Sequence, residues 1–474
     1  MSGIFGVVSE KDCVEDLFFG TDYHSHLGTM FGGLDVLDGD HNRRIHSLAN
    51  EQFRSKFSDF YKNVSGKKGM GVISDYEAQP LIFDTSFGKF SIAHVGKVSN
   101  LDSLVEDVKS NNGHFLGMSG GDKNPAELMG ILINQGKDYV DGIQIAQEQI
   151  RGSSSMMLLA DEGIYLARDK FGRTPIVVGK KDGAMAATLE TTAFLNQGFE
   201  VEKNLGPGEI GILTEKGYEQ LKKPEDKSAI CSFLWVYYGY PSSDYLGINV
   251  EDMRNKSGGF LARIDKEEGL EVDLVAGIPD SGTAHAIGFA EGGGYRYGRP
   301  FVKYTPTWPR SFMPQDQSMR NLVAQKKLLP IKAKIEGKKI LFCEDSIVRG
   351  TQLRDNIKML YDEYGAKEVH MRPACPPLIH SCEFLNFSRS KSVMDLAGRK
   401  AIARLEGRRE YDLEVYADEN SEPHASMVDE IRKDIGLTSL RYQKMGDMVS
   451  AIGLPKKDLC TYCWDGKGKC GGCD

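Results

Sequence analysis

One segment of this 474-residue chain, KKILFCEDSIVRGTQLRD, constrains the fold more than any other. Residues 340–343 form the short apolar run of a buried strand, and the residues from 351 onward have the spacing of an amphipathic helix. Two acids, Glu344 and Asp345, and a loop of small and hydroxyl residues lie between them. A buried strand that leads through such a loop into a helix is the unit of a parallel sheet with crossover helices. We therefore expect a doubly wound α/β domain with its ligand chemistry at the carboxyl ends of the strands.

The same strand–turn–helix pattern recurs on both sides of this segment. VDLVAGIP is followed by DSGTAHAIGFAEGG, and KEVHMRPAC supplies a further strand. The first 225 residues differ, because short strand-like runs broken by glycine turns dominate there and predict a layered α+β domain. These runs fall at residues 4–8, 71–73, 90–94, 155–160 and 176–179, and a helical pattern falls at 125–135. A lysine-rich stretch at 221–228 marks the boundary, so we expect domains at 1–225 and 226–474.

A segment within the second domain, residues 385–423, is first basic and then acidic. Runs of charge of this kind are typical of solvated surface, so we interpret the segment as a solvated insertion rather than a partner-binding patch.

Charge and hydropathy exclude several classes of protein. The formal net charge is -8, which leaves no basic field for nucleic acid. No apolar run approaches the ~18 residues of a membrane span, and the N-terminus has no secretion leader. We therefore expect a cytoplasmic protein whose nine cysteines are reduced thiols or metal ligands.

The loop after the two acids has the chemistry of a phosphate site. Backbone N–H groups at 348–351 and the hydroxyl of Thr351 can cradle a phosphate at the start of a helix. Glu344 and Asp345 then face ribose hydroxyls or a magnesium ion, since unpaired buried carboxylates are costly. The alternative is that these acids only cap the following helix.

ILFCEDSIVRGTQ resembles the signature of type I phosphoribosyltransferases, and its DSIVRGT core resembles the form found in the amidophosphoribosyltransferase family. IPDSGTAHAIGFAE, RSFMPQDQSMRNLVAQKKLLP, VHMRPACPPLIHSC and LPKKDLCTYC resemble further blocks of that family in the same order. The resemblance implies an N-terminal Ntn-hydrolase-like domain of four αββα layers. It also implies a type I phosphoribosyltransferase domain built on a parallel sheet.

The family resemblance assigns binding residues for 5-phosphoribosyl 1-diphosphate (PRPP). They are Asp280, Ser281, Arg310, Lys327, Glu344, Asp345, Ser346, Val348, Arg349, Gly350 and Thr351. The family's Mg²⁺ positions fall on Ser281, Glu344 and Asp345. The first acid is usually aspartate in the family, and Tyr240 and Gln325 stand where the family has basic residues.

Cysteines crowd the C-terminus. Taken alone, the Cys460/Cys463 pair can bind zinc, form a redox pair or supply thiolates to an iron–sulfur cluster, and Cys470 and Cys473 would complete a zinc site. The iron–sulfur branch of the family carries a 4Fe-4S cluster, and its ligand positions fall on Cys231, Cys382, Cys460 and Cys463. The resemblance therefore favours the cluster and leaves Cys470 and Cys473 without a role. Cys13, Cys343 and Cys375 are expected to be small core residues.

The N-terminal domain departs from the family's glutaminase. Ser2 occupies the position of the nucleophilic cysteine, Ser74 that of the arginine that binds the glutamine carboxylate, and Val95 that of the oxyanion-hole asparagine. One lost oxyanion donor costs about 2.7–4 kcal/mol in comparable sites. We therefore predict an inactive glutaminase, with Ser2 as a degenerate nucleophile.

The resemblance as a whole predicts an enzyme of purine biosynthesis that forms 5-phosphoribosylamine from PRPP and ammonia, with little or no use of glutamine. Two alternatives remain open: transfer to a different amine acceptor, and a non-catalytic sensor of PRPP or nucleotides. The implied partners are PRPP, ammonia or another amine donor, purine nucleotide effectors and further copies of the same chain.

Overall fold

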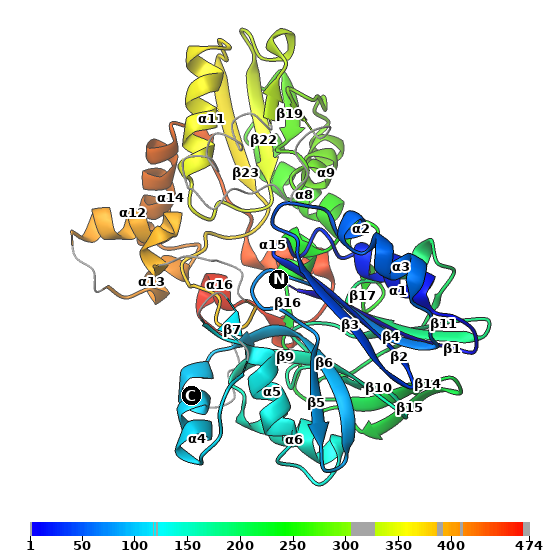
Figure 1. Ribbon diagram of the computed structural model, residues 1–474. Helices are drawn as coiled ribbons and strands as arrows, with labels where there is room; N and C mark the ends of the chain where they lie inside the picture. Colours follow the sequence, from blue (N-terminus) through cyan, green and yellow to red (C-terminus); the bar gives the residue numbers. More distant parts are fainter. Residues whose placement is uncertain are drawn as a thin grey trace.

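A computed structural model describes residues 2–116, 118–119, 122–304, 328–385, 392–407 and 411–467. The first part of the chain builds two antiparallel sheets, and a parallel sheet flanked by helices stands above them in Figure 1. The described part of the chain contains no helix that combines the length and the apolar character needed to cross a bilayer.

The two antiparallel sheets pack face to face. Their strands alternate sides, as the period of two requires: Ile4 belongs to the core between the sheets, and Phe5 to the core under the outer helices. The seven-stranded sheet has the order β13 (Glu200–Asn204), β11 (Val177–Lys181), β12 (Ala184–Thr188), β1 (Gly3–Ser9), β4 (Lys68–Ser74), β2 (Phe31–Asp38), β3 (Asp40–Ser47). The six-stranded sheet has the order β15 (Gly217–Lys222), β14 (Ile210–Thr214), β10 (Gly163–Ala167), β9 (Gly152–Ala160), β6 (Gly88–Val98), β5 (Leu81–Thr85).

Helices cover the outer face of each sheet and complete four αββα layers. Their apolar sides join the strand residues in one core per face. The seven-stranded sheet carries α1 (Val14–Asp22), α2 (Phe53–Lys56), α3 (Ser58–Asn63) and α7 (Thr192–Leu195). The six-stranded sheet carries α4 (Leu101–Ser110), α5 (Pro125–Ile133) and α6 (Tyr139–Gln149), and a small hairpin joins β7 (Met118–Ser119) to β8 (Asp122–Lys123).

A short connector follows the second sheet. It contains β16 (Ile230–Cys231), the π-helix η1 (Leu234–Tyr238), and the hairpin of β17 (Asp244–Tyr245) and β18 (Ile248–Asn249). Asn249 then caps the long helix α8 (Val250–Glu267), because its side chain accepts a hydrogen bond from the N–H of Asp252.

The parallel sheet is the expected α/β unit. Its order is β19 (Leu274–Gly277), β22 (Lys339–Glu344), β23 (Glu368–Pro373), β24 (Ser439–Leu440). Helices α8 and α9 (Thr283–Gly293) pack on one face, and α11 (Thr351–Asp362), α12 (Ala397–Glu406) and α14 (Glu422–Ile435) pack on the other. A side hairpin pairs β20 (Phe301–Lys303) with β21 (Leu328–Pro330), and 3₁₀ turns lie at η2 (Lys332–Lys334), η3 (Val393–Asp395) and η4 (Lys456–Asp458).

The remaining elements close the C-terminal part. They are α13 (Glu414–Ala417), α15 (Met445–Ile452), β25 (Leu459–Cys460) and α16 (Tyr462–Asp465). β25 returns to pair in parallel with β16, so the end of the described chain lies beside the start of the connector.

The described part of the segment at 385–423 is not wholly solvated, although its charges predict a solvated surface. Ala401 and Ile402 of α12 are buried in the same core as the parallel sheet. The N–H of Ala397 donates to the carbonyl of Val348 at 2.8 Å. The charged side chains lie on one face of α12, and Ala401 and Ile402 lie on the other. Counting charges along the sequence does not distinguish the two faces of a helix.

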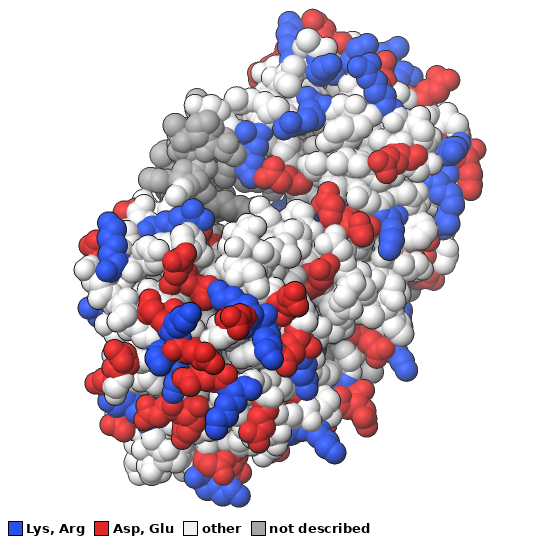
Figure 2. Space-filling model, turned by 90° about the vertical axis from the view of Figure 1, so that its right-hand side faces the viewer, with Lys and Arg blue, Asp and Glu red and all other residues white. Residues whose placement is uncertain are grey.

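The predicted strand runs lie within β1, β4, β6 and β9 and at β11, each with its ends shifted by a few residues. The predicted helix at 125–135 is α5, which begins at Pro125 after the capping Asn124 and ends two residues early. Cys13, Cys343 and Cys375 are fully buried in cores. On the face drawn in Figure 2, acidic and basic side chains are interspersed, in keeping with a modest net charge.

Candidate active site

The predicted phosphate loop connects β22 to α11, which is the strand–loop–helix order that the sequence predicts. β22 ends at Glu344, and Gly350 takes a left-handed backbone (φ 73°) immediately before α11, a conformation that glycine adopts at no steric cost. A cavity of about 590 Å³ opens above this turn. It is lined by Glu344 and by five of the predicted loop residues, Ser346, Val348, Arg349, Gly350 and Thr351.

The two acids lie together, and a buried cation, Arg254, interacts with the charge of Asp345. Ser281 donates its hydroxyl to Oε1 of Glu344 at 3.2 Å, and the N–H of Asp345 donates to the same oxygen at 3.1 Å. Ser346 donates its hydroxyl to Asp345 at 2.6 Å. Burial, and then the charge of Asp345, raise the pKa of Glu344 well above its usual range. A divalent cation would remove this cost by neutralising both carboxylates.

The donor set suits magnesium. Two carboxylates and a hydroxyl are hard oxygen ligands, and Mg²⁺ in phosphoryl sites commonly takes one or two carboxylates together with oxygens of the substrate. Within the described ranges, His, Cys, Asp and Glu side chains do not form a group of three that could hold a metal ion by themselves. Ser281, Glu344 and Asp345 are oxygen donors of the kind that bind Mg²⁺ together with oxygens of a phosphorylated substrate.

The other predicted PRPP residues divide into two groups. Asp280 lies beside Ser281 and forms an ion pair with Lys303, a residue that the sequence argument did not single out. The peptide bond between Pro279 and Asp280 is cis. Arg310 and Lys327 lie outside the described residues, as does Gln325.

A second cavity, of about 390 Å³, shares Ser281 with this site. Its walls come from the loop with Asp280 and Ser281, the connector, the N-terminal domain, Arg254 of α8 and Lys303 of β20. The connector supplies Tyr237 and Tyr240, which are 44% and 49% exposed. No local motif marks this wall, because its residues only meet in the folded chain.

His26 is the residue that the N-terminal domain contributes to this second cavity. Its Nε2 lies 2.8 Å from the fully buried carboxylate of Glu190. Tyr245 donates its hydroxyl to Glu190 at 2.7 Å. Burial alone would raise the pKa of Glu190, but His26, with smaller contributions from His24 and Tyr245, lowers that pKa below its usual value. The histidine is thereby held in place on the cavity wall.

Two of the positions that depart from the family's glutaminase pattern, Ser2 and Ser74, lie in contact. Ser2 precedes β1 and donates its hydroxyl to the hydroxyl of Ser74, the last residue of β4, at 3.3 Å; both residues are buried. The structure therefore brings together two of the three substituted positions. Val95 lies in β6 with its side chain fully buried in the core between the sheets.

A buried polar cluster lies next to Val95. His94 Nε2 lies 3.1 Å from Oε1 of Glu77, and the amide of Gln79 donates to the same oxygen at 3.2 Å. The backbone N–H of His94 donates to the side-chain oxygen of Gln79 at 2.8 Å. These contacts satisfy the side-chain amide of Gln79 and the backbone N–H of His94, which is the usual role of such a buried network.

The four predicted cluster cysteines come from distant parts of the chain and lie near one another. Cys231 and Cys460 are register partners in the parallel pair of β16 and β25, and both are buried. Cys382 shares a hydrogen bond with Cys463, and both this bond and burial raise the pKa of Cys463. Four buried thiols from three segments are the kind of ligand that an iron–sulfur cluster takes, but among the described residues they are not grouped closely enough to hold a metal ion as they stand. Cys470 and Cys473 lie outside the described residues.

Arg173 brings a positive charge to this cysteine set. Its side chain is fully buried, and its guanidinium lies 3.9 Å from the ring centre of Phe384. Burial raises the pKa of Cys460 to about 11, while the charge of Arg173 acts to lower it. No local motif marks Arg173, since it lies in the loop between β10 and β11, far from any cysteine in sequence.

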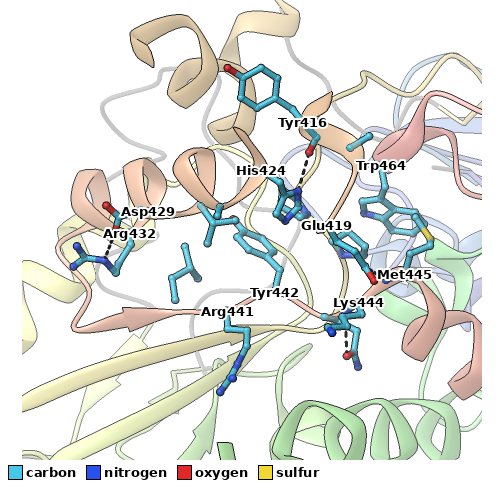
Figure 3. A pocket seen from close by; sticks show the side chains of 17 residues that line it. Tyr416, Glu419, His424, Asp429, Arg432, Arg441, Tyr442, Lys444, Met445 and Trp464 are labelled. Carbon is cyan, nitrogen blue, oxygen red and sulfur yellow. Dashed lines mark hydrogen bonds and ion pairs between the residues drawn. The ribbon is translucent and has the colours of Figure 1, made fainter. Parts of the chain in front are cut away.

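A third cavity, of about 370 Å³, lies at the carboxyl ends of β23 and β24, between α14 and α15. Figure 3 shows Tyr442 between His424 and Arg432, with Trp464 and Met445 on the opposite side. This cavity shares no lining residue with the phosphate-loop cavity.

Both halves of the chain are similar to known proteins. The profile of a glutamine amidotransferase domain matches residues 70–196. A solved structure described as glutamine PRPP amidotransferase from B. subtilis complexed with ADP and GMP superposes with a TM-score of 0.82 at 25% identity, covering 99% of this chain and 97% of that one. A solved structure described as the allosteric regulatory enzyme of purine biosynthesis gives the same score and identity, covering 99% and 96%.

These folds define a class of enzyme in which an Ntn-hydrolase-type domain is joined to a type I phosphoribosyltransferase domain. The amidophosphoribosyltransferase of Methanothermobacter thermautotrophicus is 30% identical over 98% of this chain and 93% of its own length, and that of Synechococcus elongatus is 30% identical over 98% and 90%. The chain belongs to the amidophosphoribosyltransferase family, whose members are glycosyltransferases.

Proposed function

We propose that this protein is a magnesium-dependent PRPP transferase that forms 5-phosphoribosylamine from ammonia and does not use glutamine. The observation that carries the transferase part is the cavity above the DSIVRGT loop, with Glu344 and Asp345 at its base. We also propose that the functional division follows the boundary near residue 225, with the inactive domain at 1–225 and the transferase at 226–474.

The chain's own residues supply positioning and charge complementarity. Backbone N–H groups at the start of α11 and the hydroxyl of Thr351 bind the 5-phosphate, and Arg349 adds a positive charge at the cavity wall. Asp345 and Glu344 orient the ribose hydroxyls, and a magnesium ion bound there would neutralise diphosphate charge. Ammonia attacks C1, and pyrophosphate leaves with the bonding pair, so no protein nucleophile is required.

The loss of glutamine use rests on three substitutions. Ser74, in place of a cation, cannot hold the substrate carboxylate, and its hydroxyl is instead the acceptor for Ser2. Val95 offers no side-chain donor to an oxyanion. A hydroxyl nucleophile that lacks both the substrate clamp and this donor should not hydrolyse glutamine at a useful rate.

We further propose that Cys231, Cys382, Cys460 and Cys463 hold a 4Fe-4S cluster that serves a structural purpose. Support comes from their burial and their closeness in the fold. Purine nucleotides as effectors and assembly into a homo-oligomer are part of the same proposal. A solved relative is described as complexed with ADP and GMP, which supports the proposal that purine nucleotides are effectors.

Pyrophosphate release from PRPP tests the proposal. With Mg²⁺ and ammonium chloride, release should rise with pH as more NH₃ becomes available, and glutamine should give no release above the blank. Binding of PRPP without release in any ammonium concentration would instead indicate a sensor. Glutamate formation from glutamine, with contaminating glutaminase excluded, would refute the loss of the N-terminal activity.

Restoring only the nucleophile should not restore glutamine use. Ser2→Cys should remain inactive with glutamine, because the carboxylate clamp and the oxyanion donor are still absent. The combined variant Ser2→Cys, Ser74→Arg, Val95→Asn is the informative comparison. Glutaminase activity in the single variant would show that the other two positions are not needed.

A further inference from the structure

The third cavity is separate from the candidate active site. It measures about 370 Å³ and shares no lining residue with the phosphate-loop cavity or with the second cavity. α14 forms one wall with His424, Val428 and Arg432, and the turns that follow β23 and β24 contribute further walls. Ligands of α/β folds bind at this end of the parallel strands. Small-molecule sites measure about 300–1,000 Å³, so the cavity has room for a molecule with one ring.

Aromatic side chains line this cavity. Figure 3 shows Tyr442 on one side, with Trp464 and Met445 on the opposite side. The ring of Trp464 stacks on that of Phe233 with ring centres 4.8 Å apart, which fixes its orientation. Tyr442 is 7% exposed, and its hydroxyl has no hydrogen-bond partner in the described part of the chain. Two rings, a thioether and an unsatisfied hydroxyl favour a ligand that has a flat aromatic group and polar groups beside it.

Most charged groups of the wall are already neutralised. Arg432 pairs with Asp429 at 2.8 Å, and Arg441 pairs with Glu268 at 3.0 Å and with Asp265. These cations therefore do not call for an anionic ligand.

One cation and one anion of the wall remain. Among the residues that the structure describes, neither Lys444 nor Glu419 forms an ion pair, and both are exposed. Glu419 accepts the backbone N–H of Met445 at 2.9 Å, so its carboxylate lies beside the residue that follows Lys444. Two opposite charges thus border the same part of the cavity. A ligand that carries both an ammonium group and a carboxylate can pair with both.

The helix that forms one wall of the cavity also reaches the phosphate loop. Asp434, near the end of α14, pairs with Arg354 of α11 at 2.8 Å, and Ile435 lies against Gly350. A ligand that contacts α14 therefore favours the arrangement in which this helix supports the turn before α11.

We propose that this cavity is an effector site for an aromatic α-amino acid, whose ring lies between Tyr442 and Trp464. The ammonium group of the ligand faces Glu419, and its carboxylate faces Lys444. Occupancy holds α14 in place and thereby raises the affinity for PRPP. This effect on PRPP rests on the function proposed above, whereas the binding of the amino acid does not.

Titration calorimetry of the full chain with L-phenylalanine tests the site. L-Phenylalanine should bind at least about tenfold more tightly than L-alanine, which lacks the ring, 2-phenylethylamine, which lacks the carboxylate, and 3-phenylpropionate, which lacks the ammonium group. Glu419→Gln should make L-phenylalanine and 3-phenylpropionate bind equally, and Lys444→Gln should do the same for L-phenylalanine and 2-phenylethylamine. Asp418→Asn changes a neighbouring exposed acid that does not line the cavity, and it should leave all four affinities unchanged.

PRPP titrations with and without saturating L-phenylalanine test the effector role. PRPP should bind at least about fivefold more tightly when the amino acid is present, which is the lower end of the usual coupling between two sites. Asp434→Ala removes the contact between α14 and α11, so it should abolish this gain while L-phenylalanine still binds.

The outcomes separate this inference from the proposed function. No heat from L-phenylalanine up to its solubility, or equal binding of the four compounds, overturns the site. Binding of L-phenylalanine that leaves the affinity for PRPP unchanged overturns the effector role. Absence of PRPP binding under every condition overturns the proposed transferase and the effector role, and the four titrations still decide whether the amino-acid site exists.

Discussion

At the residue scale, the carboxylates of Glu344 and Asp345 are the most strongly constrained groups of the candidate site. They are adjacent and largely enclosed, and the pKa of Glu344 is raised by burial and by its neighbour. Two carboxylates in this position favour a bound cation, because a cation stabilises both ionised forms.

Asp345→Asn should therefore weaken magnesium-dependent PRPP binding by about 1.5–3 kcal/mol, the scale of a charged hydrogen-bond partner. Titration calorimetry with and without Mg²⁺ measures this. Asp182→Asn, at an exposed turn between β11 and β12, is the control and should bind PRPP as the parent does. Unchanged affinity in Asp345→Asn would mean that the loop does not bind the ribose or the metal.

Two buried histidines predict how stability depends on pH. Burial lowers the pKa of His24 and of His285 from 6.5 to about 4. Each is therefore neutral in the folded protein at a pH where the unfolded chain is protonated. Their contribution to stability is complete above pH 6.5 and is lost as the pH falls toward 4.

The free energy of unfolding should accordingly fall by about 2 kcal/mol per histidine between pH 7 and pH 5. Urea denaturation at both pH values measures the difference. His24→Gln and His285→Gln, which cannot titrate, should each lose about half of the pH dependence that the pair contributes. A variant with the full dependence of the parent would show that its histidine is protonated in the fold.

At the element scale, α14 connects the C-terminal segment to the phosphate loop. Asp434, near the end of α14, forms ion pairs with Arg354 of α11 at 2.8 Å and with Arg404 of α12 at 2.9 Å. The side chain of Ile435 lies against Gly350. The segment that charge alone predicts to be solvated thus supports the turn that we propose binds phosphate.

Asp434→Ala should lower stability by about 1 kcal/mol, because the pairs it removes are half exposed, and should weaken PRPP binding several-fold by loosening the loop. Asp429→Ala removes ion pairs with Arg432 and Lys433 on the same helix and does not touch α11. Asp429→Ala should lower stability by about as much as Asp434→Ala does, and it should leave the affinity for PRPP unchanged. Equal PRPP affinity in the two variants would show that α14 does not support the loop.

At the scale of the whole molecule, the cysteine set joins the two halves of the chain. β16 pairs with β25 there, the N–H of Lys97 in β6 donates to the carbonyl of Phe384 at 2.9 Å, and Arg173 lies beside Cys460. A cluster bound by these cysteines would cross-link segments that are remote in sequence, and its loss should loosen the whole fold.

The protein isolated without oxygen should be brown and contain iron and labile sulfide. Cys463→Ser should lose the iron and melt at a lower temperature, because one ligand is removed from a buried set. Cys470→Ser and Cys473→Ser, at cysteines without an assigned role, should retain the iron. Stoichiometric zinc with negligible iron and sulfide in the parent protein would contradict the cluster.

The sequence by itself determined three features: the predicted phosphate loop, the strands that alternate with helices on both sides of it, and the helix that begins at Pro125. Each of these depends on residues that lie within about a dozen positions of one another in the chain. The apolar runs encode burial, and Gly350 encodes the left-handed turn. The resemblance to the family added two predictions: the PRPP-binding residues around Glu344 and Asp345, and the four cysteines of the cluster.

The tertiary structure decided the rest. Only folding brings His26 to Glu190, Arg173 to Cys460, and the tyrosines of the connector to Ser281. It also decided that α12 is half buried, since its apolar side faces a core supplied by other segments. Such contacts depend on which distant surfaces pack together to remove apolar area from water, and a single segment carries no signal of its eventual neighbour.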